Sequence, residues 1–155
     1  MTINNAVQAA TFQSMKIAKL FFYISTMFIV PLVPTTYASD LIVVVENIKS
    51  DQGNVRAAVF NNAKDFTKTP LLGKFIPAKV GAVTFTFKNL PAGQYAVSAF
   101  HDMNANQKLD TNFVGKPVEP YGFSRDARGT FGPPSFEDAS VQIDEATNTV
   151  TILVK

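Results

Sequence analysis

Apolar and polar residues alternate with a period of two through much of the C-terminal two thirds of the chain. In GAVTFTFKNL (81–90), Val83, Phe85 and Phe87 fall on one face of an extended chain, while threonines and a lysine fall on the other. QYAVSAFHD (94–102) alternates in the same way. Such a pattern is typical of strands with one face buried and one face exposed. Both segments are therefore predicted to be strands that border one core.

Other segments complete an all-β pattern. LIVVVENI (41–48) and VRAAVF (55–60) are separated by the turn residues SDQGN, and we predict that they form a β-hairpin. ASVQI (139–143) and TVTILVK (149–155) predict two closing strands, and a seventh strand is predicted near residues 74–80. No segment beyond residue 38 shows sustained helical spacing. The pattern predicts an antiparallel β-sandwich of about seven strands.

The N-terminal part of the chain has the composition of a secretory signal. Lys16 and Lys19 precede an apolar run from Leu20 to Val33, and small residues lead to a candidate cleavage point between Ala38 and Ser39. A positive region, an apolar region and small residues at the cut are the components of a signal peptide. The run is short for a spanning helix and contains two prolines, although an uncleaved anchor is the alternative.

We therefore predict a cleavable signal peptide over residues 1–38, with a possible true start at Met15, and a single domain over residues 39–155. Cleavage would remove two of the 14 lysines and arginines, which leaves 12 against 12 acidic residues. No basic field then remains to attract nucleic acid, and no stable membrane insertion is expected. The chain has no cysteine, which excludes disulfides, thiolate nucleophiles and a cysteine-linked lipid anchor. We expect an exported protein, either periplasmic or extracellular.

A polar segment, HDMNANQKLDTNF, follows the strand that ends near residue 102. Its oxygen-bearing side chains stand at alternate positions, which is the spacing that lets a calcium loop direct several ligands to one centre. The predicted ligands of a Ca²⁺ cofactor are the side chains of Asp102, Asn104, Asn106 and Asp110 and the backbone carbonyl of Lys108.

Two positions depart from the calcium-loop pattern. Gln107 stands where glycine is usual, and a left-handed bend costs a non-glycine residue about 1–2 kcal/mol. Phe113 stands where a bidentate acid is usual, and Glu137 or Asp138 would have to replace it from elsewhere. Asp and Asn are also common turn residues that bond to their own backbone. A metal loop and a polar turn therefore both remain open from the spacing.

Two blocks of sequence resemble a known family. FKNLPAGQYAVSAFHDMNANQKLDTNFVGKP and the later YGFSRDARGTFGPPSFEDA are similar to the bacterial domain of unknown function 2141 (DUF2141) family. The resemblance implies a small exported β-sandwich, similar to prealbumin-like and carboxypeptidase-regulatory-like domains, and it implies no established activity. The polar loop also resembles calcium loops of related sandwich modules, which would give the predicted ligands their roles.

The second block also carries the candidate ligand-binding residues. Aromatic and arginine side chains on a loop can recognise sugars, peptides or acidic groups, or they can simply anchor the loop to the sheet. The candidates are Tyr121, Phe123, Arg125, Arg128, Phe131 and Phe136.

These features predict a non-enzymatic binding module that meets an unidentified ligand or protein of the cell envelope through its end loops. Two alternatives remain. One is an enzyme acting on an envelope substrate with His101, the only histidine, and nearby acids such as Asp102. The other is a structural or assembly protein of the envelope that docks by its edge strands.

Overall fold

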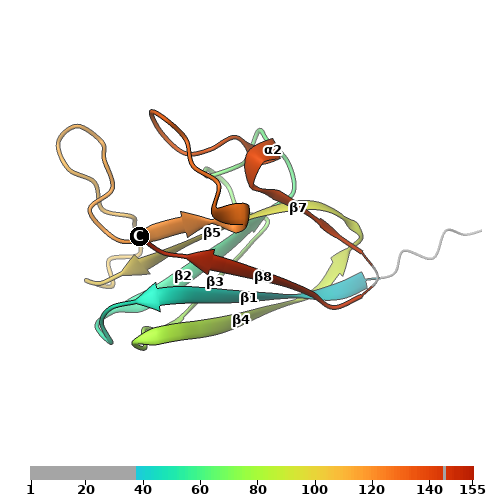
Figure 1. Cartoon of the computed structure of the whole chain (residues 1–155), viewed down its shortest axis with the longest axis horizontal. Coiled ribbons are helices and arrows are strands. Elements are labelled where there is room, and N and C mark those ends of the chain that lie inside the picture. The colour runs from blue at the N-terminus through green and yellow to red at the C-terminus, as the bar shows by residue number, and fades with distance from the viewer. Residues whose placement is uncertain (1–37, 145) are drawn as a thin grey trace, which may run out of the picture. The chain divides into compact units, whose positions relative to one another are not determined.

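The computed structural model describes residues 38–144 and 146–155. These residues form eight strands and two short helical segments (Figure 1). The bounds are β1 Ala38–Ile48, β2 Asn54–Phe60, β3 Leu72–Pro77, β4 Gly81–Pro91, β5 Gly93–Asp102, β6 Tyr121–Phe123, the 3₁₀ helix η1 Ser124–Asp126, α2 Phe136–Ala139, β7 Ser140–Ile143 and β8 Asn148–Leu153. Apart from Ala38, the predicted signal segment lies outside the described residues. Within the described residues, no helix has both the length and the apolar character needed to cross a membrane.

The strands form two sheets, as the all-β prediction requires. The smaller sheet has the order β4–β1–β8, and the larger has the order β3–β2–β5–β6, with β7 also paired to β5 (Figure 1). The prediction of purely antiparallel pairing is wrong at one place, because β1 and β8 run parallel from Leu41↔Asn148 to Glu46↔Leu153. A parallel pair needs a long crossover, and here nearly all of the domain lies between the two strands.

The predicted hairpin of residues 41–48 and 55–60 is also wrong, because β1 and β2 lie in different sheets. Turn residues indicate that the chain reverses, but they do not specify which strand it then pairs with. The connection between β1 and β2 crosses between the sheets beside the connection between β3 and β4. Gly53 O accepts a hydrogen bond from Ala78 N at 3.1 Å, and Asp51 Oδ1 accepts one from Val80 N at 2.5 Å. The two crossings therefore support each other.

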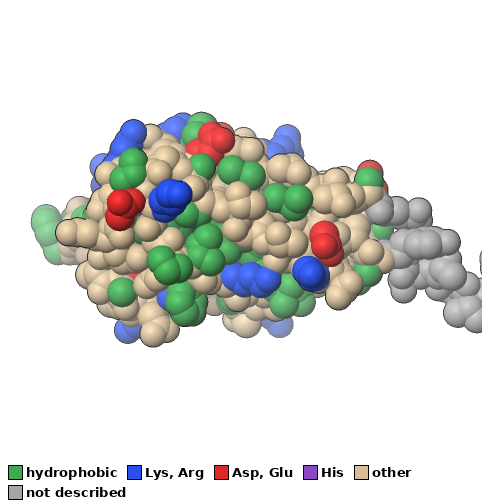
Figure 2. Space-filling model, turned by 90° about the horizontal axis from the view of Figure 1, so that it is seen from below, with side chains coloured by type: hydrophobic (Ala, Val, Ile, Leu, Met, Phe, Trp, Pro, Cys, Tyr) green, Lys and Arg blue, Asp and Glu red, His purple; other side chains and the backbone are tan. Residues whose placement is uncertain are grey.

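The facing sides of the two sheets enclose the main core, and the alternation predicted for β4 and β5 is confirmed. Each of the longer strands contributes alternate residues, among them Leu41, Val43, Val45, Val55, Ala57, Val59, Val83, Phe85, Phe87, Tyr95, Val97, Ala99, Val150 and Ile152. Large apolar side chains also remain at the surface, and Figure 2 shows apolar side chains interspersed with basic and acidic ones on one face.

A second apolar cluster lies on the opposite, outer face of the larger sheet. Its members come from β2, β5, β6, α2 and the connection between β2 and β3, and they are Phe60, Phe66, Ala96, Phe123, Phe136 and Ala139. The Phe66 ring stands edge-on to those of Phe60 and Phe136, with centroids 5.3 and 5.9 Å away. This cluster anchors two long connections, residues 61–71 and 124–139, to the outer face.

Candidate functional site

The polar loop begins at Asp102, the last residue of β5, whose side chain is fully buried. The Asp102 carboxylate accepts backbone hydrogen bonds from Asn106 N at 3.0 Å and from Gln107 N at 2.9 Å. The guanidinium of Arg56, on the neighbouring strand β2, lies 3.8 Å from Asp102 Oδ2. The buried charge is therefore balanced from both sides, by loop amides and by a cation.

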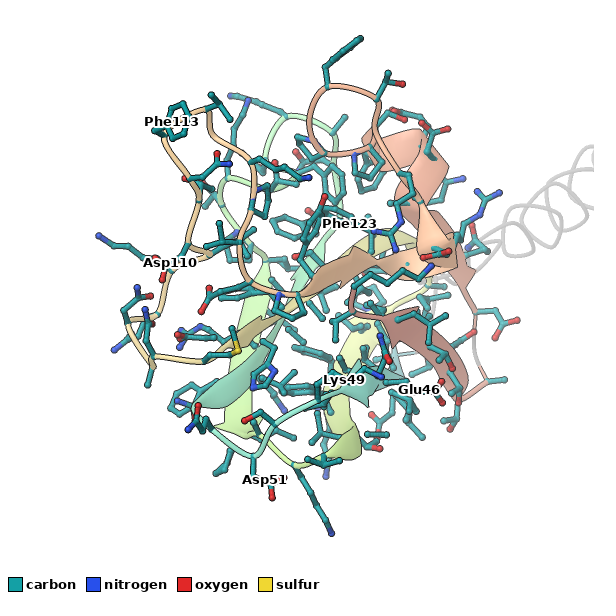
Figure 3. The ribbon with its side chains drawn as sticks, turned by 60° about the vertical axis from the view of Figure 1, so that its left-hand side comes forward. Glu46, Lys49, Asp51, Asp110, Phe113 and Phe123 are labelled. Atoms are coloured by element: carbon teal, nitrogen blue, oxygen red, sulfur yellow. The ribbon has the colours of Figure 1, made fainter. Side chains whose placement is uncertain are left out.

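Three of the other predicted ligands, Asn104, Asn106 and Asp110, come together on one side of the loop. Asn104 Nδ2 and Asn106 Nδ2 donate to the two oxygens of Asp110, at 2.7 and 2.9 Å. Asn104 Oδ1 accepts from Asn106 N at 3.1 Å, and Asn106 Oδ1 accepts from Lys108 N at 2.8 Å. Figure 3 shows Asp110 on this loop, at the periphery of the domain. The arrangement is compatible with a metal loop and equally with a polar turn.

The backbone adopts the left-handed bend at Gln107, where the absence of glycine made this conformation costly. Gln107 has φ of 71° and Ala105 has φ of 57°, so both lie in the left-handed region. Gln107 N donates to Asp102 from this conformation, and that bond offsets part of its cost. The loop thus has a left-handed bend at position 107 although the residue there is not glycine.

Glu119 is a structural residue of the loop that the sequence did not single out. It is 5 % exposed, and its two carboxylate oxygens accept from Met103 N at 2.9 Å and from Asp110 N at 3.0 Å. One side chain thereby holds both ends of the loop and joins them to the segment that leads into β6. In the sequence, Glu119 is a single acid between Val118 and Pro120. Its partners are backbone amides, which no pattern of residue types reveals.

The acids proposed to complete the metal shell have other positions. Asp138 Oδ2 accepts from the hydroxyl of Ser135 at 2.7 Å, where Ser135 caps the N-terminus of α2, and Glu137 is exposed on the same turn. In residues 38–144 and 146–155, no group of three or more histidine, aspartate and glutamate side chains is arranged to hold a metal ion. The loop alone offers two carboxylates and two amides, a low charge for a divalent cation.

The six candidate ligand-binding residues are divided between the interior and the surface. Phe123 and Phe136 belong to the outer-face cluster and are 7 and 8 % exposed, whereas Phe131 is fully exposed and Tyr121 is half-buried. Tyr121, Phe123 and Phe131 line a hollow of about 590 Å³ between residues 109–117 and 129–133. Phe123 lies well inside the domain in Figure 3, whereas Phe113 is at a loop tip.

The two candidate arginines have intramolecular partners. Arg125 Nη1 donates to the backbone oxygens of Glu137 and Ser140, at 3.5 and 3.4 Å. Arg128 Nη2 lies 2.8 Å from Asp126 Oδ1, and Lys155 Nζ lies 2.9 Å from Asp126 Oδ2. Hydrogen bonds from Lys155 and then Arg128 lower the pKa of Asp126 below its ordinary value. A ligand role for these arginines stays a prediction.

His101 is enclosed, and its geometry does not support catalysis. It is 1 % exposed, and its Nε2 lies 2.7 Å from the backbone oxygen of Gln52. Successive side chains of a strand point to opposite faces, so His101 points between the sheets with Ala99, while Asp102 points outward. The acid and the histidine therefore do not form a dyad.

The sequence profile of the DUF2141 family, described as an uncharacterized protein conserved in bacteria, matches residues 43–151. The chain belongs to the DUF2141 family. The resemblance seen in the two sequence blocks is thus confirmed, and the match extends from β1 to β8. Comparisons with curated proteins and with solved structures gave no match.

The DUF2141 match includes every element of the candidate site. The loop of residues 102–110, Glu119 and the block from Tyr121 to Phe136 all lie within residues 43–151. The family description assigns no activity, so a role for these residues depends on their chemistry alone.

Proposed function

We propose that this DUF2141 protein is an exported, non-enzymatic binding module of the cell envelope, whose loop of residues 102–110 is stabilised by Ca²⁺. The proposal is carried by the convergence of Asn104, Asn106 and Asp110 beside Asp102, together with the left-handed bend at Gln107. The charged, apolar and small-residue regions of residues 16–38 support export.

Calcium would change the hydrogen bonds inside the loop. The amides of Asn104 and Asn106 now direct their nitrogens to Asp110. A half-turn of each amide would turn oxygen, the atom that Ca²⁺ binds, toward Asp110. It would also break the bonds that the two Oδ1 atoms accept from Asn106 N and Lys108 N, a cost that the ion would have to offset. Asp102, Asp110 and the carbonyl of Lys108 would supply the remaining protein ligands. Two carboxylates favour weak binding, on the order of 10⁻⁴–10⁻³ M, as in extracellular modules.

Glu119 would transmit the effect of the ion to the binding surface. Its carboxylate joins Met103 N and Asp110 N to the segment that enters β6. A loop ordered by calcium would hold this segment more firmly and so present Tyr121 and the exposed Phe131 with less loss of entropy when a ligand binds. The ligand itself would be a molecule or protein of the envelope.

A calcium titration followed by thermal unfolding tests the proposal. The metal-free protein should melt at a higher temperature when calcium is raised to millimolar concentration, because the folded state alone has the site. The Asp102→Ala, Asp110→Ala double variant should lose this calcium-dependent shift, whatever its own melting temperature. Glu137→Gln, which removes an exposed carboxylate outside the loop, should keep the full shift.

An unchanged melting temperature of the native protein at millimolar calcium would remove the metal from the proposal. Magnesium at the same concentration is the control for ionic strength and for unspecific divalent binding, and it should have a much smaller effect.

A further inference from the structure

Three small residues lie side by side on the outer face of the larger sheet. Ala58 on β2 is the direct cross-strand neighbour of Gly73 on β3 and of Ser98 on β5. A Cβ atom added at Gly73 would meet nothing within 4 Å. The sheet surface is therefore hollow along this row, because its side chains are too short to fill the space.

Large side chains border the hollow on both sides. The next row on the same face runs Phe75–Arg56–Phe100–Tyr121, each residue directly opposite the next across the strands. On the other side stands Phe60, which belongs to the outer-face cluster. The register of the sheet thus forms a groove with a floor of small residues and largely aromatic walls.

Two connections frame this groove. Thr67, Lys68 and Pro70 from the connection between β2 and β3 line one part, and Gln107–Leu109 from the polar loop line another. The groove, which is open to solvent, has a volume of about 640 Å³, within the range of small-molecule sites. The lining is mainly apolar, with a few polar groups such as the hydroxyl of Ser98.

Arg56 provides a positive group in the groove wall. Its side chain is 24 % exposed, and its guanidinium lies 5.2 Å from the ring centroid of Phe75. Its closest acid, Asp102, is 3.8 Å away and fully enclosed, and the guanidinium donates no hydrogen bond to any residue that the structure describes. The N–H donors of Arg56 that do not face Asp102 are thus available to an incoming carboxylate.

The charged side chains that line the groove are all basic, while Asp102 is enclosed beside Arg56. Lys68 and Lys108 stand on the two framing connections, and no acidic residue lines the groove within the described chain. Lys74 also borders it, but its ammonium lies 5.3 Å from the ring of Phe87 on the opposite sheet, so it does not contribute. A positive, partly apolar hollow favours a ligand that is both anionic and apolar.

We propose that this groove binds a small carboxylate with an apolar body, of the size and chemistry of a medium-chain fatty acid. The carboxylate contacts Arg56, and the apolar body lies over Ala58 and Ser98 between the aromatic walls. The site lies on the sheet face beside the polar loop and does not require a calcium ion. It therefore extends the proposed function.

Calorimetric titration with decanoate in the presence of EDTA tests this site without calcium. The native protein should bind decanoate, whereas acetate, with the charge alone, and decanol, with the apolar body alone, should bind at least about tenfold more weakly. Arg56→Gln should weaken decanoate binding by about tenfold or more. Gly73→Leu should also weaken it, because the new side chain fills the hollow without entering strained backbone.

Lys49→Gln is the control, since it removes an exposed positive charge outside the groove and should leave decanoate binding unchanged. Thermal unfolding of each variant verifies that it is folded. The proposal is overturned if decanol binds as tightly as decanoate, if folded Gly73→Leu binds normally, or if the native protein takes up no decanoate. Because EDTA is present, none of these results depends on the calcium proposal.

Discussion

Gln107 occupies a backbone conformation that glycine adopts at lower cost. Its φ is 71°, and the left-handed region costs a side-chain-bearing residue about 1–2 kcal/mol. Gln107→Gly keeps the N–H that donates to Asp102 and removes this penalty, although glycine also loses more entropy on folding. We expect a net gain of about 0.5–1 kcal/mol in the free energy of unfolding, measured by urea denaturation.

Lys108→Gly provides the control for Gln107→Gly. Lys108 is the next residue in the chain and is not among those with positive φ, so glycine there brings only the entropic cost. Equal effects of the two substitutions would contradict the assignment of strain to residue 107.

The sequence predicted individual residues well where a repeating pattern carried the information. Val83, Phe85 and Phe87 alternate into the core as expected, whereas the metal role that the spacing of Asp102 and Asp110 suggests stays a prediction. Glu119 was missed because its partners are the backbone amides of Met103 and Asp110, which any residue type would offer. A side chain that hydrogen-bonds to the backbone needs no particular partner residue, so no second residue in the sequence points to the interaction.

The loop of residues 102–110 depends on a carboxylate outside it. Glu119→Gln replaces one accepting oxygen by an NH₂ group, so either Met103 N or Asp110 N loses its partner beside a buried side chain. We expect a loss of about 1–3 kcal/mol in the free energy of unfolding by urea denaturation. Glu137→Gln makes the same chemical change at an exposed position and should alter stability by less than about 0.5 kcal/mol.

Strand positions could be predicted from the sequence, whereas strand partners could not. The predicted segments 41–48, 55–60, 81–90 and 94–102 all overlap strands of the structure. The hairpin failed because the turn before Asn54 carries the chain to the other sheet, where β2 pairs with β3 and β5. Both arrangements bury the same apolar faces, so periodicity alone cannot distinguish them.

Backbone hydrogen bonds join the two sheets where β6 meets the residues that follow β8. Tyr121 N donates to Lys155 O at 3.2 Å, and Lys155 N donates to Tyr121 O at 3.1 Å. Between them, a Cβ atom at Gly122 would lie 2.5 Å from Leu153 O and 2.8 Å from Ile152 Cγ2. Only glycine leaves room for this junction, which joins the edge of one sheet to the edge of the other.

Gly122→Ala should therefore destabilise the whole molecule. The added methyl group has to separate β6 from β8, and such overpacking costs about 1–3 kcal/mol in the free energy of unfolding. Chemical denaturation followed by circular dichroism would measure the loss. Gly93→Ala is the comparison, because its Cβ would meet only Tyr95 Cε2 at 3.6 Å, an ordinary contact. A normal midpoint for Gly122→Ala would show that the junction can relax.

The parallel pairing of β1 with β8 affects how the domain can form during synthesis. β1 is the middle strand of its sheet, and one of its two neighbours is β8, residues 148–153, which lies more than 100 positions later in the chain. Contacts of such sequence separation form slowly, since a very long loop must close before they contribute. A chain still emerging from the ribosome therefore exposes one edge of β1 until its final strand is available. Folding of this sheet is completed only after translation has passed residue 153.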